Sequence, residues 1–432
     1  MVKAGMMVGV SAFALLGAAT AFAQSVPSEA AASGRATCPG LPSSVGECAG
    51  SAGTVESVSQ PPPARAEGAG TPALRVQGSG RFEFDDNPLL RTDNQDSIYG
   101  FIATPRVTLV DVTDVSRLEL GGQVEANRYD DAQFNSNDLY FNFLGSRRFR
   151  TGMASLKADF SYDTTRTSEV AESGLSIAGV RNTRFSVAPH MQTDISELDQ
   201  FILDGSATVS RYDDLINYTN YRTYTLKPTL QHSFTQTQAG FFALEGVHYE
   251  TTSGSDVTTN TLIPQVGWVS QLSQRWKLTG SVGAQYSVTD YALEFPGRED
   301  GSEWTYYYDA AINYDDLNDH ISFQTSRRPQ SLSSGNQAQT TRFKLAGTHT
   351  INPRLDLKLD LTYQISDRGS NSSGSSDISF IEAAPQLVYR LTEKLNLNLM
   401  YRHREREIGD AEAKSDAVMV TLTFSPDEFR ID

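Results

Sequence analysis

The stretch Arg354–Tyr363, with the sequence RLDLKLDLTY, alternates leucine or tyrosine with charged or polar residues at every position. Successive side chains of a β-strand point to opposite faces, so this stretch predicts a ribbon with one apolar and one charged face. A soluble sandwich would bury the leucines in its core. A transmembrane β-barrel would turn them to lipid and the charges to a wet lumen. The alternation is the same in both folds, so the rest of the chain has to decide between them.

Similar segments follow one another from Leu74 to the end of the chain, for example Trp276–Tyr286, Trp304–Tyr314 and Leu395–Tyr401. Their period is two residues, and no helical period competes with it in this region. Aromatic residues gather near the segment ends, which is typical of the girdles at a membrane interface. The pattern predicts an all-β chain built from one repeated kind of strand.

The connections between these segments favour the barrel. Short connections such as Leu317–Asp319 and Asn352-Pro353 alternate with longer polar ones such as Thr165–Val180, Arg368–Ser376 and Ile408–Ala413. An up-and-down barrel has tight turns at one rim and loops at the other, whereas sandwiches use Greek-key crossovers. We therefore predict an antiparallel up-and-down transmembrane β-barrel of about 18 strands, or about 16 as the alternative, with its apolar faces toward lipid.

The N-terminal region has a different composition. Residues 1–23 predict a secretory signal peptide, with a basic Lys3, an apolar run and the cleavage site Ala21–Ala23. Residues 24–72 are rich in Ala, Gly, Ser and Pro and predict a flexible, disordered periplasmic tail. Cys38 and Cys48 in this tail form a disulfide or remain free thiols. We place the barrel at residues 73–425, followed by a C-terminal extension at residues 426–432.

Composition and motifs exclude several classes of function. The formal net charge of -16 argues against nucleic-acid binding. No nucleophile elbow, zinc-protease motif or phosphate-binding glycine loop occurs, and the six histidines share no motif, so we expect no enzyme, cofactor or metal site. Acidic pairs such as Asp85-Asp86 and Asp213-Asp214 could bridge divalent cations to surface glycolipid, but solvated loop charge is the favoured interpretation.

Five strands carry a proline near their middle, and each proline is in phase with the apolar face. The five prolines are Pro105, Pro189, Pro228, Pro264 and Pro385. Proline removes a hydrogen-bond donor from the ladder, so its recurrence at one position of the hairpin predicts a β-bulge repeated around the wall.

The face opposite the lipid is predicted to line a pore and carries charges of both signs. The cations assigned to this pore lining are Arg106, Arg117, Lys157, Lys344, Arg354, Lys358, Arg390, Arg402, Arg404 and Arg406. These charges either form structural ion pairs or set a field that selects solutes. Arg402, Arg404 and Arg406 lie near the outer mouth, where they suit carboxylate or phosphate groups unless Glu405 and loop acids neutralise them.

The signal peptide, the Ala/Gly/Pro-rich tail, the sequence Asp85–Pro88 after the first strand and the proline-containing strands resemble the β-barrel porins of the second type. That resemblance implies an outer-membrane protein of a Gram-negative bacterium, associated with exopolysaccharide production and export. It implies a channel for a surface polysaccharide, with lipid, lipopolysaccharide and periplasmic export components as partners. The alternatives are a general diffusion porin for small polar solutes and a non-conducting structural or assembly barrel.

Overall fold

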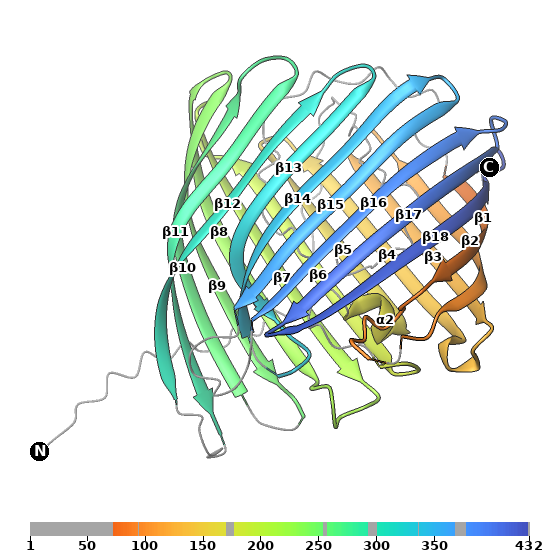
Figure 1. Ribbon diagram of the computed structural model, residues 1–432. Coiled ribbons are helices and arrows are strands. Elements are labelled where there is room, and N and C mark those ends of the chain that lie inside the picture. The colour runs from red at the N-terminus through yellow and green to blue at the C-terminus, as the bar shows by residue number, and fades with distance from the viewer. Residues whose placement is uncertain are drawn as a thin grey trace, which may run out of the picture.

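The computed structural model describes residues 72–93, 95–169, 177–253, 257–292, 300–335, 337–367 and 377–430. In this part of the chain, eighteen long antiparallel strands form one sheet, which closes into a barrel because β1 pairs with both β2 and β18 (Figure 1). The predicted all-β up-and-down barrel is confirmed, with 18 strands rather than 16. The predicted signal peptide and the cysteine pair lie outside the described residues.

The strands, in chain order, are β1 (Ala73–Asp85), β2 (Ile98–Val112), β3 (Ser116–Tyr129), β4 (Ser136–Phe149), β5 (Gly152–Thr164), β6 (Arg181–Asp194), β7 (Asp199–Tyr212), β8 (Tyr221–Thr235), β9 (Gln238–Thr251), β10 (Val257–Gln271), β11 (Trp276–Tyr291), β12 (Gly301–Asp315), β13 (Asp319–Ser331), β14 (Gln337–Asn352), β15 (Leu355–Asp367), β16 (Ile378–Arg390), β17 (Leu395–Ile408), β18 (Ala411–Phe424) and the two-residue β19 (Phe429–Arg430). Two short helices, η1 (Ala132–Phe134) and α2 (Thr165–Ser168), lie in the connections. No helix among the described residues is long and apolar enough to cross a membrane.

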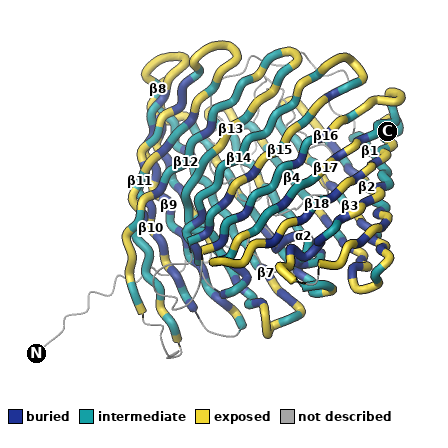
Figure 2. The backbone as a smooth tube through the Cα atoms, in the orientation of Figure 1, coloured by how far each residue is buried: buried dark blue, intermediate teal, exposed yellow. Residues whose placement is uncertain are grey.

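The two faces of each strand differ in exposure, as the alternating colours of Figure 2 show. On β15, Leu357 and Leu359 are 45% and 40% exposed, while their neighbour Asp356 is only 6% exposed. The same holds on β1, where Phe82 and Phe84 are exposed and Arg81 is buried. The apolar side chains thus cover the outside of the barrel and the polar ones line its interior, which answers the question that Arg354–Tyr363 raised.

The two rims differ in the length of their connections. At the upper rim in Figure 1, eight turns of two to four residues join each even-numbered strand from β2 to β16 to the strand that follows it. The other rim carries the longer connections and α2, and it is the extracellular rim by the usual pattern of outer-membrane barrels. The last connection is an exception, because β17 and β18 are separated only by Gly409-Asp410. The loop predicted at Ile408–Ala413 is therefore wrong, and strand pairing extends to Ile408↔Ala411.

The predicted proline bulges are also wrong. Across Pro105, Ala103 pairs with Ala126 and Arg106 pairs with Gln123, so equal numbers of residues oppose each other and the register does not shift. The other four prolines interrupt the pairing in the same way, always toward the following strand, while pairing to the preceding strand continues through the proline. Because proline has no N–H to donate, two residues at each proline are left out of one ladder. This arrangement, unlike a bulge, needs no extra residue in the strand.

The residues after β18 continue the closure of the barrel. β19 pairs with the start of β1, where Ala73 opposes Arg430 and Leu74 opposes Phe429. Next to this pairing, the Arg75 guanidinium forms an ion pair with Glu428. Residues 425–430 therefore lie along the short-turn rim and lengthen the closure between β1 and β18.

Candidate functional site in the lumen

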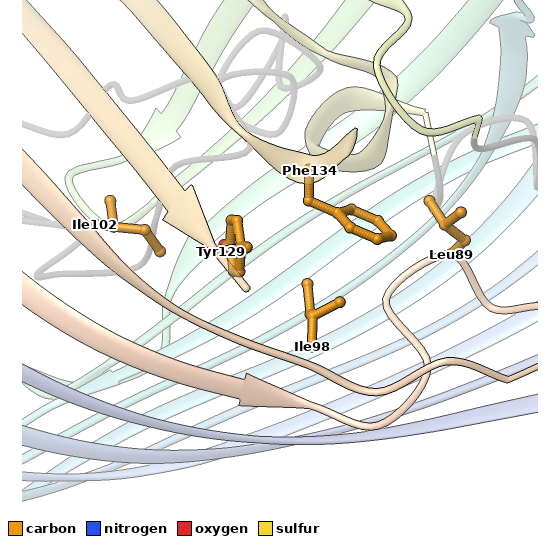
Figure 3. Close-up of a cluster of buried hydrophobic side chains, with 5 residues drawn as sticks. All are labelled: Leu89, Ile98, Ile102, Tyr129 and Phe134. Carbon is orange, nitrogen blue, oxygen red and sulfur yellow. The ribbon is translucent and has the colours of Figure 1, made fainter. Parts of the chain in front are cut away.

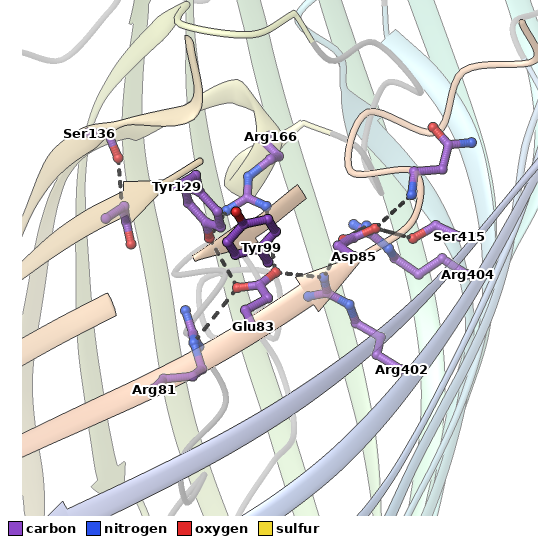
Figure 4. Close-up of polar contacts among 12 residues, drawn as sticks. Arg81, Glu83, Asp85, Tyr99, Tyr129, Ser136, Arg166, Arg402, Arg404 and Ser415 are labelled. Atoms are coloured by element: carbon purple, nitrogen blue, oxygen red, sulfur yellow. Dashed lines mark hydrogen bonds and ion pairs between the residues drawn. The ribbon is translucent and has the colours of Figure 1, made fainter. Parts of the chain in front are cut away.

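The outer half of the lumen contains a network of arginines and carboxylates, which Figure 4 shows converging on β1. The carboxylate of Glu83 lies 3.4 Å from the Arg402 guanidinium, 3.5 Å from that of Arg166 and 3.8 Å from that of Arg81. The hydroxyl of Tyr129 donates a hydrogen bond to the same carboxylate at 3.1 Å. Glu83 is 2% exposed, so three cations from different elements surround one buried anion.

Asp85, two residues further along β1, holds the next part of the network. Arg402 and Arg404 donate to its Oδ2 atom at 3.1 Å and 2.8 Å. The hydroxyl of Ser415 on β18 and the backbone N–H of Asn87 donate to its Oδ1 atom. Both carboxylates are on β1, two of the four arginines are on β17, and Ser415 is on β18. The network therefore links the two sides of the barrel closure on the lumen side of the wall.

α2 lies in the connection between β5 and β6 and enters the lumen. Its residue Arg166 contacts the network of ion pairs. The Arg166 guanidinium lies over the ring of Tyr129, 4.8 Å from its centroid, and donates to the Tyr129 hydroxyl. Tyr129 itself packs with Leu89, Ile98, Ile102 and Phe134, as Figure 3 shows. The apolar cluster and the ion pairs therefore hold one loop in the outer half of the lumen.

The sequence Asp85–Pro88 explains how the first loop turns inward. The side chain of Asn87 accepts a bond from the Arg91 N–H and donates to the carbonyls of Arg91 and Lys414. Leu90 then adopts a positive φ of 48° and is fully buried against Phe380 and Ala413. Such a backbone conformation is uncommon for leucine, so the surrounding contacts must stabilise it.

A second element enters the lumen from the opposite side. We call Leu332–Gly335, between β13 and β14, the hairpin tip. The backbone N–H of Thr219 donates to the Ser333 carbonyl at 2.7 Å, and the Tyr249 hydroxyl donates to the Leu332 carbonyl at 3.4 Å. Leu332 and Ser333 are at most 1% exposed. The hairpin tip is thus bound to β9 and to the connection between β7 and β8, away from its own strands.

The lumen toward the short-turn rim is more accessible and carries acid–base pairs. Arg117 and Glu119 lie 2.8 Å apart on β3, and Lys157 and Asp159 lie 3.2 Å apart on β5. Across β6 and β7, the Nδ1 atom of His190 lies 2.7 Å from Asp204. The pairs on β3 and β5 join residues two apart on one strand, a spacing that places both side chains on the same face.

The predicted pore-lining residues fall into three groups in the structure. Arg402, Arg404 and Arg406 face inward, but the first two are held by Glu83 and Asp85, and Arg406 donates to the Leu90 carbonyl. Glu405 points to the outside beside Lys414 and does not neutralise the row. Most of the others face the accessible part of the lumen: Arg106, Arg117, Lys157, Lys344 and Lys358.

The remaining two predicted residues lie at the short-turn rim. Arg354 is exposed in the turn between β14 and β15, outside both strands. Arg390 ends β16 and donates to the carboxylate of Asp356 at 2.9 Å. These two cations therefore belong to the periplasmic edge of the barrel rather than to its wall.

Three important residues are missing from the sequence-based set. Glu83 and Asp85 alternate with Phe82 and Phe84, so the period-2 pattern could have placed both carboxylates inward. Arg166 lies in a polar connection, and no local signal indicates that this loop folds into the lumen. In the described residues, no group of three or more His, Cys, Asp or Glu side chains is arranged to hold a metal ion.

Comparisons with known proteins give matches among solved structures alone. No family model and no curated protein matches the chain. Among solved structures, it is similar to OccAB4 of Acinetobacter baumannii, at a TM-score of 0.46 and 8% identity, covering 84% of this chain and 100% of that chain. It is also similar to OccK2 (OpdF) of Pseudomonas aeruginosa in complex with glucuronate, at 0.43 and 9%, covering 82% and 99%.

A third similar structure is the ferric citrate transporter FecA in its unliganded form, at a TM-score of 0.41 and 11% identity, covering 77% of this chain and 60% of that chain. Likeness at this level concerns the barrel fold alone, so the resemblance to the porins of the second type stays a prediction. The closed sheet, the apolar outer face and the polar interior establish a Gram-negative outer-membrane β-barrel channel.

Proposed function

We propose that this barrel is a channel for saccharides. The observation that carries the proposal is the pairing of opposite charges along the accessible lumen, at Arg117 with Glu119 and Lys157 with Asp159, beside the hydrogen-bonded pair His190 and Asp204. Adjacent opposite charges largely cancel each other at a distance, so an ion of either sign meets attraction and repulsion together. A neutral solute with many hydroxyl groups can hydrogen-bond to both partners of each pair.

The two inward elements restrict which solutes can pass. α2 and the hairpin tip occupy the outer half of the lumen from opposite walls. A narrow path favours an extended single chain over a bulky solute. The family resemblance makes a surface polysaccharide the preferred saccharide, exported with the help of periplasmic components, and this choice rests on resemblance alone.

Liposome swelling tests the solute class. Proteoliposomes are diluted into stachyose, a neutral tetrasaccharide, or into polyethylene glycol of matched hydrodynamic size. We expect faster swelling in stachyose, because its hydroxyl groups can pair with the charged wall. Equal rates for the two solutes at every size tested would indicate a general diffusion porin. Absence of swelling with correctly folded protein would indicate the non-conducting alternative.

Deletion of the gene tests the polysaccharide. We expect less secreted polysaccharide in the deletion strain, with recovery when the wild-type gene is returned. Unchanged secretion, together with selective stachyose permeation in liposomes, would retain the saccharide channel and reject export as its role.

A further inference from the structure

The pairing between β12 and β13 ends early on its extracellular side. It runs from Asp315↔His320 to Tyr308↔Arg327, which is eight residue pairs, whereas the neighbouring β11–β12 ladder has 14. Beyond Tyr308, β12 continues to Gly301 paired only with β11, and β13 continues to Ser331 paired only with β14. In Figure 1 the two strands share a turn at the upper rim and separate toward the lower one. We call this part of the wall the β12–β13 seam.

The hairpin tip keeps the seam apart. Its contacts to Thr219 and Tyr249 hold the end of β13 inside the lumen, and the Thr223 hydroxyl lies 2.9 Å from that of Ser331. A lipid-exposed strand edge without hydrogen-bond partners is avoided in membrane proteins, because each unsatisfied backbone group costs several kcal/mol in hydrocarbon. The incomplete ladder between β12 and β13 therefore points to a functional role for this part of the wall.

Two consecutive arginines occupy the point where the ladder ends. Arg327 has the same orientation as Ile321 and Phe323 on the outer face, and its guanidinium lies over the ring of Tyr306, 4.8 Å from the centroid. It also donates to the carboxylate of Asp367 at 2.7 Å. Because neighbouring side chains alternate, Arg328 points to the lumen, where it donates to Asp309 on β12.

A guanidinium on the outer face of a barrel is unfavourable. A charged side chain there costs about 2–4 kcal/mol at the bilayer midplane and less toward the interface. The Arg327 side chain is 14% exposed, and its partner Asp367 ends β15 on the extracellular side, so this guanidinium lies toward the interface. Ionisable residues within a membrane usually mark a pathway for a solute or ion. Arg327 and Arg328 together place one fixed cation on each side of the same seam.

We propose that the β12–β13 seam is a lateral portal through which a single-chain carboxylate amphiphile, of the fatty-acid class, passes between the lumen and the outer leaflet. Arg327 and Arg328 each already bind a carboxylate, that of Asp367 and that of Asp309. An incoming carboxylate replaces these partners in turn and moves from one guanidinium to the next. Its acyl chain lies against the exposed rings on the outer face of β12, where Trp304 is 68% exposed.

The portal opens by moving side chains and leaves the eight backbone pairs below it intact. This separates it from the saccharide path along the barrel axis, which uses the paired charges of β3, β5, β6 and β7. The inference therefore does not depend on the proposed function. It concerns a second class of solute and a second exit.

Tryptophan quenching by 11-bromoundecanoate tests the portal in phosphatidylcholine vesicles. The chain has three tryptophans, so replacing two with Phe leaves either Trp304 at the seam or Trp268 on the outer face of β10 as the sole reporter. Bilayer partitioning quenches both reporters without saturation. We expect an additional saturable component for Trp304 alone, and a loss of about tenfold in its apparent affinity in R327Q/R328Q, because each replacement removes a charge-assisted bond.

A reporter on the lumen side tests passage through the wall. Tyr307→Trp, in a chain with the three natural tryptophans replaced by Phe, lies on the lumen side of the seam, and Tyr140→Trp on β4 is the matched lumen control. We expect 11-bromoundecanoate to quench Tyr307→Trp and not Tyr140→Trp, and the neutral 11-bromoundecanol to show no such difference. Equal quenching of both lumen reporters, or a saturable Trp304 component that R327Q/R328Q leaves unchanged, would overturn the portal. If Tyr307→Trp does not fold, the Trp304 and Trp268 comparison decides the question.

Discussion

At the scale of single residues, Arg402 and Arg404 show that an inward orientation does not make a side chain available to a solute. Both face the lumen, but Glu83 and Asp85 hold them at 3.4 Å or less. Arg106 and Lys344 also face inward, and neither has an ion-pair partner among the described residues. The partners of a cation, more than its direction, decide whether it contributes to stability or to selectivity.

The first prediction concerns stability. R402Q/R404Q leaves two buried carboxylates with fewer cations, and breaking buried pairs of this kind costs about 3–5 kcal/mol. We expect a lower urea midpoint for unfolding in detergent, read from the shift between folded and unfolded bands on an unheated gel. R106Q/K344Q is the matched control, and its midpoint should stay close to that of the wild type. Equal midpoints for both double variants would show that the network is not needed for folding.

The second prediction concerns selectivity. R106Q/K344Q removes two cations without close acidic partners, so the lumen becomes more attractive to cations. We expect the cation-to-anion permeability ratio to rise about twofold at low salt and less at high salt, where screening shortens the range of the charges. The measurement is the reversal potential across a planar bilayer with a salt gradient. A potential equal to that of the wild type at low salt would assign both cations a structural role.

At the scale of the element, the sequence predicts orientation better than partnership. Period-2 alternation places Leu357 outside and Asp356 inside without any knowledge of neighbouring strands. It cannot show that Glu83 meets Arg402, because those residues are distant in sequence and meet only through closure of the barrel. Nor can it show that a proline is accommodated by a gap in one ladder and not by a bulge, since both leave the same apolar phase.

The third prediction concerns the register at the prolines. Val107 and Val266 are 45% and 56% exposed on the outer face, while Gln265 is 1% exposed on the inner face and Arg106 also points inward. Spin labels at the two valines should respond to lipid-soluble oxygen, and labels at Arg106 and Gln265 to a water-soluble relaxer. The reversed response would mean a one-residue slip, which turns every side chain of the strand to the other face.

The fourth prediction concerns the hairpin tip. T223A/Y249F removes two side-chain hydrogen bonds, one to Ser331 at the end of β13 and one to Leu332 of the tip, and each contributes about 1 kcal/mol. We expect more frequent brief openings to a higher conductance in single-channel recordings. Thr279→Ala on β11 is the control, because it truncates a buried lumen threonine outside the contacts of the tip. Identical gating in the two variants would mean that the tip does not limit the current.

At the scale of the whole molecule, closure is the property that the sequence indicates most strongly. A chain of two-faced strands with polar connections can satisfy its backbone in lipid only by joining its first and last strands, as β1 and β18 do. What enters the lumen could not be predicted in the same way. α2 and the hairpin tip lie in connections whose composition resembles that of any exposed loop, and their inward positions depend on contacts with distant strands.

The most direct test of the account is single-channel recording of the purified, refolded protein in a planar bilayer. The paired charges of the lumen predict discrete, stable conductance steps with weak selectivity between potassium and chloride. A protein that shows the folded band on an unheated gel, inserts into the bilayer and produces no steps would contradict the account, because the polar interior would then be a closed structural core.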